Sequence, residues 1–505
     1  MNMEKYYITT PIYYVNSKPH IGHAYTTIVA DILARYYRLK LGQENVWFLT
    51  GTDEHGSKIA QVAEKEGKDP QTFVDEVSAL FQSSWKNLNI SNNDYIRTTE
   101  KRHEEVVIEI LTKLKSAKTP LGNDFIYSGD YEGLYCVGCE SYKKEEDLVD
   151  GKCPDHNKEP ELLKESNWYI RLSDYAKVLK DKIQSDEIKV LPADRKTEVL
   201  SFIEQGLEDV AISRQQVKWG IPVPFDKEQT IYVWVDALLN YVSALGYPND
   251  EKYKKFWPAD TQLLAKDILK FHAIIWPAML IAAGIEAPKE LFIHGYFTID
   301  GKKMSKTIGN VIDPNDLVAE FGVDAARYLI VSQFPFGQDG DVKAEEFKVK
   351  YNSDLANGVG NLVSRVITMA EKYCDNKIPA LKYTGAFDLT ALWKRVEQNY
   401  TDYKIYENLR EIQDLISWAD NHIAETTPWA KAKEGKVDEV NQIIYNLIEV
   451  LKQLAGLILP ILPQTGAEIL RRINFVSADI ESIKTLNNLD SEKTLDKGEP
   501  LFLRK

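Results

Sequence analysis

The sequence has few cysteines, no long apolar run and no excess of positive charge. Four cysteines among 505 residues exclude a disulfide scaffold. No apolar stretch reaches the ~18 residues that span a bilayer, and the chain opens without a charged and then apolar leader, so we expect a cytoplasmic protein without a membrane partner. The formal net charge of −14 argues against a surface that binds nucleic acid, DNA included, over its whole extent, but it allows a local basic track.

The sequence does contain an alternation of strand-like and helix-like segments. Apolar runs such as Tyr6–Thr10, Val46–Thr50 and Ile231–Val235 have the length of buried strands, and helical periodicity follows several such runs. This alternation predicts an α/β fold with a split, Rossmann-like parallel sheet. A helical pattern then runs to about residue 474, which predicts a separate all-α helical bundle or, as an alternative, an oligomerisation domain.

Changes in composition divide the chain. We predict a first sheet half at 1–115, a connective insert at 116–221 with a small β-rich part at about 130–165, a second sheet half at 222–312, a linker at 313–350, the helical bundle at 351–474 and a tail at 475–505 that packs back. The closing residues 500–505 are read as a last strand.

The stretch from Pro11 to Tyr25 is predicted to be the loop between the first strand and the first helix. Open α/β sheets bind ligands at the carboxyl ends of their strands. His20 and His23 share a helix face, and Gly22 leaves room for a flat ring to approach the backbone. N–H groups at a helix start also attract phosphate. The alternative is that the two histidines only cap and pack the helix start.

A basic loop follows the last predicted strand of the sheet. Lys303 and Lys306 are three residues apart, with Ser305 between them, and a lysine ammonium suits phosphate. The loop is either solvated or able to close over a triphosphate. With the two histidines opposite, such a loop would hold the phosphates of a nucleotide together with their Mg²⁺.

Three of the cysteines lie in the insert. Cys136 and Cys139 form C-x2-C, and Cys153 and His156 form C-x2-H. This spacing predicts a zinc knuckle that holds one structural Zn²⁺ per chain, with four protein ligands and no open position for water. The alternatives are four unrelated residues, or a redox dithiol at Cys136 and Cys139.

The two loops resemble the signatures of class I aminoacyl-tRNA synthetases. Residues 20–23 read HIGH, and residues 303–307 read KMSKT, close to the family's KMSKS. Over essentially its full length the chain resembles the methionyl-tRNA synthetases, in their small bacterial and organellar form with one zinc knuckle. The segments PIYYVN at 11–16, TGTDEHG at 50–56 and YVWVDA at 232–237 match this family, whereas Ala265 stands where the family often has glycine.

The resemblance implies a role for individual residues. It implies that His20, His23, Lys303 and Lys306 are catalytic. It implies ATP binding by Gly22, Asp267 (at the ribose), Lys303, Ser305 and Lys306. It implies methionine binding by Ile12, Tyr14, Asp53 (at the ammonium), Trp234, Leu238, Tyr241 and His272. Aromatic side chains suit a thioether, although some of them could simply pack the core.

The resemblance also gives the helical bundle a function. It implies that Asn361, Arg365 and Trp429 read the CAU anticodon of tRNA(Met), and bases that are splayed out are indeed read by stacking and edge contacts. The alternative for these three residues is a helix-surface pair and a packing tryptophan.

The implied activity is that of a methionine–tRNA ligase, which forms methionyl-adenylate from L-methionine and ATP and then methionyl-tRNA for translation initiation and elongation. The insert is too small for an editing domain, and the appended tRNA-binding domain of some dimeric family members is absent, so we expect a monomer. The alternatives are a class I ligase for another small amino acid, such as cysteine, and a non-catalytic tRNA-binding or zinc scaffold protein.

Overall fold

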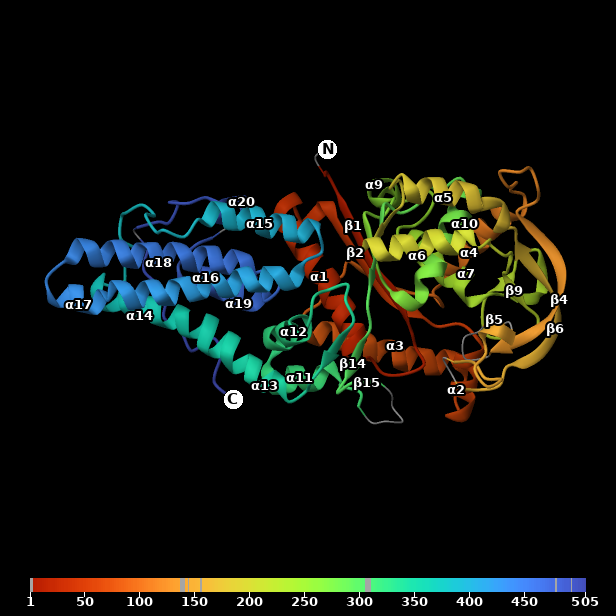
Figure 1. The fold of residues 1–505 in the computed structure, drawn as a ribbon, viewed down its shortest axis with the longest axis horizontal. Coiled ribbons are helices and arrows are strands. Elements are labelled where there is room, and N and C mark those ends of the chain that lie inside the picture. Colours follow the sequence, from red (N-terminus) through yellow and green to blue (C-terminus); the bar gives the residue numbers. More distant parts are fainter. Residues whose placement is uncertain are drawn as a thin grey trace. The chain divides into compact units, whose positions relative to one another are not determined.

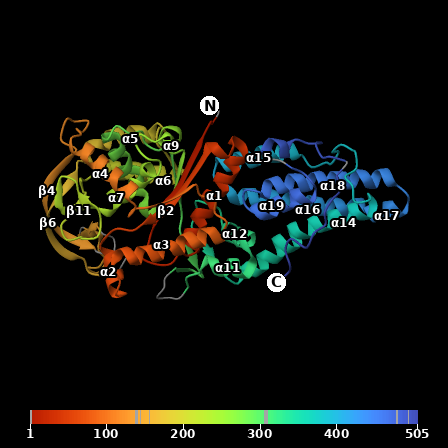
Figure 2. The same cartoon turned by 180° about the vertical axis from the view of Figure 1, so that it is seen from behind.

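The computed structural model describes residues 3–136, 141–143, 145–154, 157–304, 310–476, 479–491 and 493–505 (Figure 1; seen from behind in Figure 2). The chain forms two compact units. The first unit comprises residues 1–19, 47–83 and 92–294, and the second comprises residues 20–46, 84–91 and 295–505. Across the described ranges, no helix combines the length and the apolar character that crossing a membrane requires.

The centre of the first unit is a six-stranded sheet in the order β3-β2-β1-β12-β13-β7. Its strands are β1 Tyr6–Tyr14, β2 Val46–Asp53, β3 Asp94–Arg97, β7 Lys189–Leu191, β12 Thr261–Ala265 and β13 Glu290–His294. The pairs β1–β12, β2–β3, β12–β13 and β13–β7 are parallel, which confirms the predicted α/β fold. The strand order reverses beside β1, so the carboxyl ends of β1 and β12 border the crevice where such sheets bind ligands.

Helices surround this sheet. They are α2 Ser57–Lys65, α3 Pro70–Asn87, α4 Lys101–Lys115, α5 Ala176–Gln184, α6 Ala193–Glu204, α7 Val233–Leu238, α8 Asn240–Ser243, α9 Glu251–Phe256 and α10 Trp276–Ala282. Helix α4 buries Val107, Ile110, Leu111 and Leu114, the three- and four-residue spacing of one helix face. These side chains join a single hydrophobic core with residues of the sheet such as Leu49.

Residues 126–231 add two small sheets to the first unit. One contains β4 Ile126–Cys136, β5 Ser141–Lys143, β6 Glu161–Ile170 and β8 Val210–Ala211, and the other contains β9 Ser213–Arg214, β10 Pro222–Val223 and β11 Asp226–Ile231. Strands β4 and β6 form a long antiparallel ribbon (Figure 1) that pairs from Ile126 opposite Ile170 to Tyr135 opposite Glu161. The first cysteine of the predicted knuckle, Cys136, is the last residue of β4.

The second unit is mainly helical, which confirms the predicted helical region. Its helices are α1 Ile21–Leu41, α11 Pro314–Phe321, α12 Val323–Val331, α13 Glu346–Lys350, α14 Asn361–Tyr373, α15 Leu389–Thr401, α16 Ile405–Thr426, α17 Pro428–Lys433, α18 Val437–Ile458, α19 Pro463–Arg472 and α20 Ile480–Lys484. A small sheet, β15-β14-β16, contains β14 Phe297–Ile299, β15 Lys302–Lys303 and β16 Gly340–Val342. The last residues contact the π-helical segment Tyr351–Gly360 through a bond from Tyr351 to the Leu503 carbonyl, without forming the predicted strand.

Two other predictions are wrong locally. The run Ile231–Val235 is not a strand beyond Ile231, the last residue of β11, because the N–H groups of Val235 and Asp236 bond to the Tyr232 carbonyl and start helix α7. A short apolar run cannot by itself distinguish a buried strand from a buried helix. The first strand also does not end before Pro11 but continues to Tyr14. The described pairing with β12, at Ile8 and Thr9, comes before the proline and needs no N–H from it.

Candidate functional site

Aromatic side chains form a cluster in the first unit, the aromatic cup, which consists of Trp234, Tyr241, Phe271, His272 and Trp276. The rings of Trp234 and Phe271 stack with their centroids 4.1 Å apart and their planes at 12°. Tyr241 is hydrogen-bonded to His272 Nε2 at 2.8 Å and lies 5.8 Å from the Trp276 ring. The helix that carries Phe271 and His272 has π geometry over Phe271–Ile275, a form that is frequent at functional sites.

Five of the residues predicted to bind methionine belong to the hydrophobic core of the first unit or pack against it. Leu238 and Tyr241 belong to the core of the first unit, and Ile12, Tyr14 and Trp234 pack against it while remaining partly exposed. These residues therefore include both buried and partly exposed apolar side chains, a combination that suits contact with an apolar ligand.

His272 is neutral in this cup. Its Nδ1 lies 3.1 Å from the Ile268 carbonyl, which can only accept, so Nδ1 carries the proton and Nε2 accepts from the Tyr241 hydroxyl. Burial lowers the pKa of His272 to about 4, although the bond to Ile268 opposes this shift. The imidazole is thus an uncharged part of the wall.

Two carboxylates lie at strand ends, as predicted. Asp53 is the last residue of β2 and is only 6% exposed. Its carbonyl accepts from the Val15 N–H at 3.2 Å, which ties the β2 loop to the end of β1. Asp267 is exposed in a 3₁₀ turn directly after β12.

The histidines His20 and His23 begin helix α1 in the second unit. His20 Nδ1 accepts from the Gly22 N–H at 3.1 Å, and His23 Nδ1 accepts from the His20 N–H at 3.2 Å. Their rings stack 3.8 Å apart. Burial, together with the neighbouring His20, lowers the pKa of His23 well below its usual value. Because each Nδ1 accepts a hydrogen bond, the proton of each neutral ring is on Nε2. His20 and His23 therefore each carry an Nε2–H donor.

The lysine loop begins at a tight hairpin in the same unit. Asp300 and Gly301, with φ of +50° and +71°, connect β14 to β15. The Asp341 carboxylate accepts from the Gly301 N–H at 2.7 Å and from the Thr298 hydroxyl at 2.6 Å.

The helix start lies close to this loop. A Cβ placed on Gly22 would be 3.1 Å from the Met304 side chain, so the two predicted ATP-binding motifs meet here. Ser305 and Lys306 lie outside the described residues, and only the backbone of Lys303 is described.

The predicted zinc knuckle is described in part. Cys136 and Cys153 are buried and form no disulfide, whereas Cys139 and His156 lie outside the described residues. Cys153 starts a tight turn, in which its carbonyl accepts from the Asn157 N–H and its own N–H donates to the Lys158 carbonyl. These two thiols and this turn fit half of a zinc site, and among the described residues no fuller set of metal ligands is found.

The predicted anticodon residues lie in the helical bundle. Asn361 is exposed at the start of α14. Arg365, one turn further on, pairs with Asp420 of α16 at 3.1 Å. Trp429 is 40% exposed and follows Pro428 at the start of α17. The three side chains are accessible rather than packed in the core.

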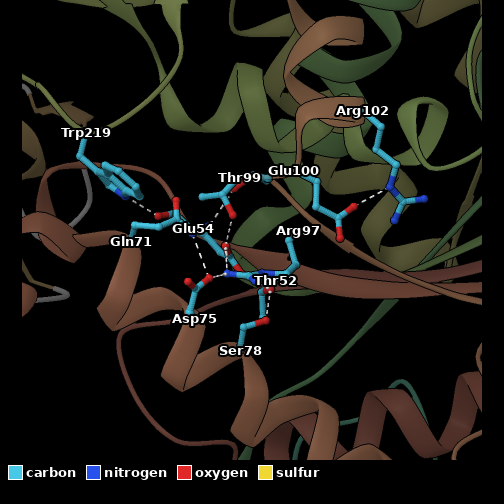
Figure 3. Close-up of polar contacts among 11 residues, drawn as sticks. Thr52, Glu54, Gln71, Asp75, Ser78, Arg97, Thr99, Glu100, Arg102 and Trp219 are labelled. Carbon is cyan, nitrogen blue, oxygen red and sulfur yellow. Dashed lines mark hydrogen bonds and ion pairs between the residues drawn. The ribbon is translucent and has the colours of Figure 1, made fainter. Parts of the chain in front are cut away.

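Sequence reasoning missed the residues that hold the Asp53 loop. Glu54 and His55 are buried at 0% and 4% exposure, and Figure 3 shows the polar contacts of Glu54 with Thr52, Arg97, Thr99 and Trp219. The available signal was three consecutive ionisable residues directly after a buried strand, a pattern that requires partners.

Known proteins share this sequence and fold. The family model for class I tRNA synthetases (M) matches residues 6–161 and 144–367. Methionine–tRNA ligases of Thermotoga maritima and Clostridium perfringens are 42% and 45% identical, over 99% and 100% of this chain and 80% and 78% of those proteins. A structure of Mycobacterium tuberculosis methionyl-tRNA synthetase in complex with methionyl-adenylate has a TM-score of 0.92 at 34% identity, covering 99% of this chain and all of that one.

Proposed function

The chain belongs to the methionyl-tRNA synthetases of class I and is a methionine–tRNA ligase, and on this premise we propose which of its residues carry each step. The methionine side chain is held by Ile12, Tyr14 and Leu238 together with Trp234, Tyr241 and His272 of the cup. A thioether gains favourable sulfur–aromatic contacts there. The Asp53 carboxylate accepts hydrogen bonds from the substrate ammonium.

His20 and His23 bind ATP through their Nε2–H groups. The observation that carries this proposal is that both Nδ1 atoms accept from backbone N–H groups, which leaves Nε2–H as the donor of each ring. Lys303, Ser305 and Lys306 bind the phosphates from the other side, and Asp267 binds the ribose. The Gly22 backbone lies against the nucleotide because it carries no side chain.

The chemistry needs positioning and charge stabilisation rather than a protein nucleophile. A methionine carboxylate oxygen attacks the α-phosphorus, and pyrophosphate leaves. A terminal hydroxyl of tRNA then attacks the carbonyl carbon of the adenylate, and AMP leaves. Mg²⁺, when bound with ATP, neutralises charge on the leaving phosphates.

The remaining assignments concern tRNA and zinc. Asn361, Arg365 and Trp429 read the CAU anticodon of tRNA(Met), which their exposure supports. Cys136, Cys139, Cys153 and His156 hold one structural zinc ion. The enzyme acts as a cytoplasmic monomer.

Methionine-dependent ATP–pyrophosphate exchange tests the proposal. We expect exchange with L-methionine and none with L-cysteine, and we expect His20→Ala and Lys306→Ala each to lower kcat by roughly 100-fold, since each removes a donor to the transition state. Arg395→Ala, which removes an exposed charge paired with Glu411, is the control and should leave kcat unchanged. Exchange with cysteine, or full activity of His20→Ala, would contradict the assignments.

A further inference from the structure

Three consecutive ionisable side chains follow the apolar part of β2. Asp53, Glu54 and His55 are 6%, 0% and 4% exposed. Each buried charge costs several kcal/mol unless it is paired. The proposed function uses only Asp53. The burial and pairing of Glu54 and His55 therefore require another explanation.

Glu54 is held from several sides. Its carboxylate accepts two bonds from Arg97, at 2.7 and 2.9 Å, and one each from Thr52 at 2.7 Å and Thr99 at 2.5 Å. Its carbonyl accepts from the Trp219 indole at 2.6 Å. Figure 3 shows these partners converging on Glu54 from β2, from the end of β3 and from the segment that contains Trp219. A bidentate arginine pair fixes both position and orientation.

His55 is held by a second buried chain. Its Nδ1 donates to Asp236 at 2.6 Å, and His103 Nε2 donates to the other oxygen of Asp236 at 2.7 Å. Burial alone would raise the pKa of Asp236, but the charge of His55 and the bonds from both histidines lower it to about 2. His103 Nδ1 lies 2.8 Å from the Ser243 hydroxyl.

The second chain ends on the walls of the cup. Asp236 lies in α7 between Trp234 and Leu238. Ser243 lies in α8, two residues after Tyr241. The His55 chain therefore connects the loop of Asp53 to the helices that carry the methionine-binding side chains.

We propose that Glu54 and His55 are positioning residues for amino-acid recognition, which fix the Asp53 carboxylate relative to the aromatic cup. This inference rests on the proposed role of Asp53. The contact between the Asp53 carboxylate and the substrate ammonium depends on the distance between them. A displacement of about 1 Å can lower the reaction rate on the order of 100-fold. Because Glu54 and His55, the two residues that follow Asp53, are both held by hydrogen bonds, the Asp53 carboxylate has little freedom to move.

The experiment compares variants in pyrophosphate exchange, with separate KM values for L-methionine and ATP. Glu54→Gln and His55→Leu each remove one anchor. His55→Asn keeps a donor near the position of Nδ1, so it is the conservative variant. Asp53→Asn tests the premise. Lys118→Gln breaks an exposed pair with Asp124 and is the matched control.

We expect Glu54→Gln and His55→Leu to raise the KM for methionine about 10- to 100-fold and the KM for ATP less than about twofold. His55→Asn should return the methionine KM to within about threefold of the wild type, and Lys118→Gln should change neither constant. A purely structural role would lower the melting temperature and the active fraction, hence the apparent kcat, without moving the methionine KM.

Two results would overturn the inference. If Asp53→Asn raises the methionine KM while Glu54→Gln and His55→Leu leave it unchanged, only the positioning role fails. If Asp53→Asn also leaves it unchanged, the premise fails with it. Should Glu54→Gln not fold, Thr99→Val decides, because it removes one bond to the Glu54 carboxylate and should raise the methionine KM about threefold, whereas no rise would refute the role of Glu54.

Discussion

At the scale of single residues, the protonation of His272 defines the cup. Its pKa of about 4 lies below the ~6.5 of an unfolded histidine, so protonation favours the unfolded state. The contribution of neutral His272 to the free energy of unfolding is therefore complete above pH ~6.5. It is lost as the pH falls towards 4, a change of about 3 kcal/mol. In a proton NMR titration, we expect the His272 ring signal, assigned by its absence in His272→Gln, to titrate near pH 4. A midpoint near 6.5 would contradict the neutral wall.

Individual residues were predictable where the motif is local and unpredictable where partners are distant. His20, Gly22 and His23 were found because they lie within four positions of the sequence. The anchors of Glu54 were missed because Arg97 and Trp219 are 43 and 165 residues away. The periodic pattern of apolar residues carries no information about such pairings, because only the folded chain brings these residues together.

At the scale of elements, the hairpin between β14 and β15 sets the start of the lysine loop. Gly301 has a φ of +71°, and among the described residues no atom lies within 4 Å of a Cβ placed there, so Gly301→Ala would cause conformational strain of about 1–2 kcal/mol without a clash with these residues. We expect kcat for exchange to fall roughly tenfold or more as Lys303 and Lys306 shift. Gly284→Ala, at a φ of +66° and equally open, is the control. Equal activities of the two variants would contradict this role of the hairpin.

The zinc knuckle is a second element whose role is testable. Cys136 and Cys153 are buried thiols at the ends of separate segments, and a structural zinc contributes directly to folding. Metal analysis of the purified wild type should find about one zinc per chain, and Cys136→Ser should lower that content and the melting temperature. Cys374→Ser alters a cysteine outside the predicted knuckle and should change neither. Wild-type protein without zinc, or unchanged zinc in Cys136→Ser, would refute the site.

The type of an element was predictable when the segment was long. The helices of the bundle repeat their apolar face over several turns, and α16 and α18 each run for 22 residues. The prediction of a strand for the run Ile231–Val235 was wrong because five apolar residues fit a buried strand and a buried helix equally. Only the contacts of Tyr232 and Asp236 decide between the two.

At the scale of the whole molecule, the two compact units do not follow the order of the elements along the chain. Helix α1, which follows the first strand of the sheet in sequence, belongs to the second unit with the helical bundle. Its Asp31 pairs with Arg327 at 2.8 Å, both fully buried, and Tyr36 stacks on Tyr400 at 3.8 Å. Local patterns predicted the helix, but its partners lie hundreds of residues further along the chain.

Arg327 joins these remote segments through a single guanidinium. Besides Asp31, it donates to the carbonyls of Leu88 at 3.1 Å, Pro460 at 3.3 Å and Ile461 at 2.9 Å. Arg327→Met leaves Asp31 as an imperfectly compensated buried charge, and breaking such a pair costs about 3–5 kcal/mol. We expect this loss in urea unfolding, with reduced exchange activity because α1 begins at His20 and His23.

The double variant Arg327→Met with Asp31→Leu removes both charges and should regain part of the lost stability, since an apolar pair of similar volume often replaces a buried ion pair at little cost. The recovery should be incomplete because Arg35 and Ser91 also bond to Asp31. Arg395→Met breaks an exposed pair with Glu411 and should cost less than about 1 kcal/mol. If Arg327→Met were no more destabilised than Arg395→Met, the buried pair would not be what holds α1 to the bundle, and its attachment would rest on apolar contacts such as the Tyr36–Tyr400 stack.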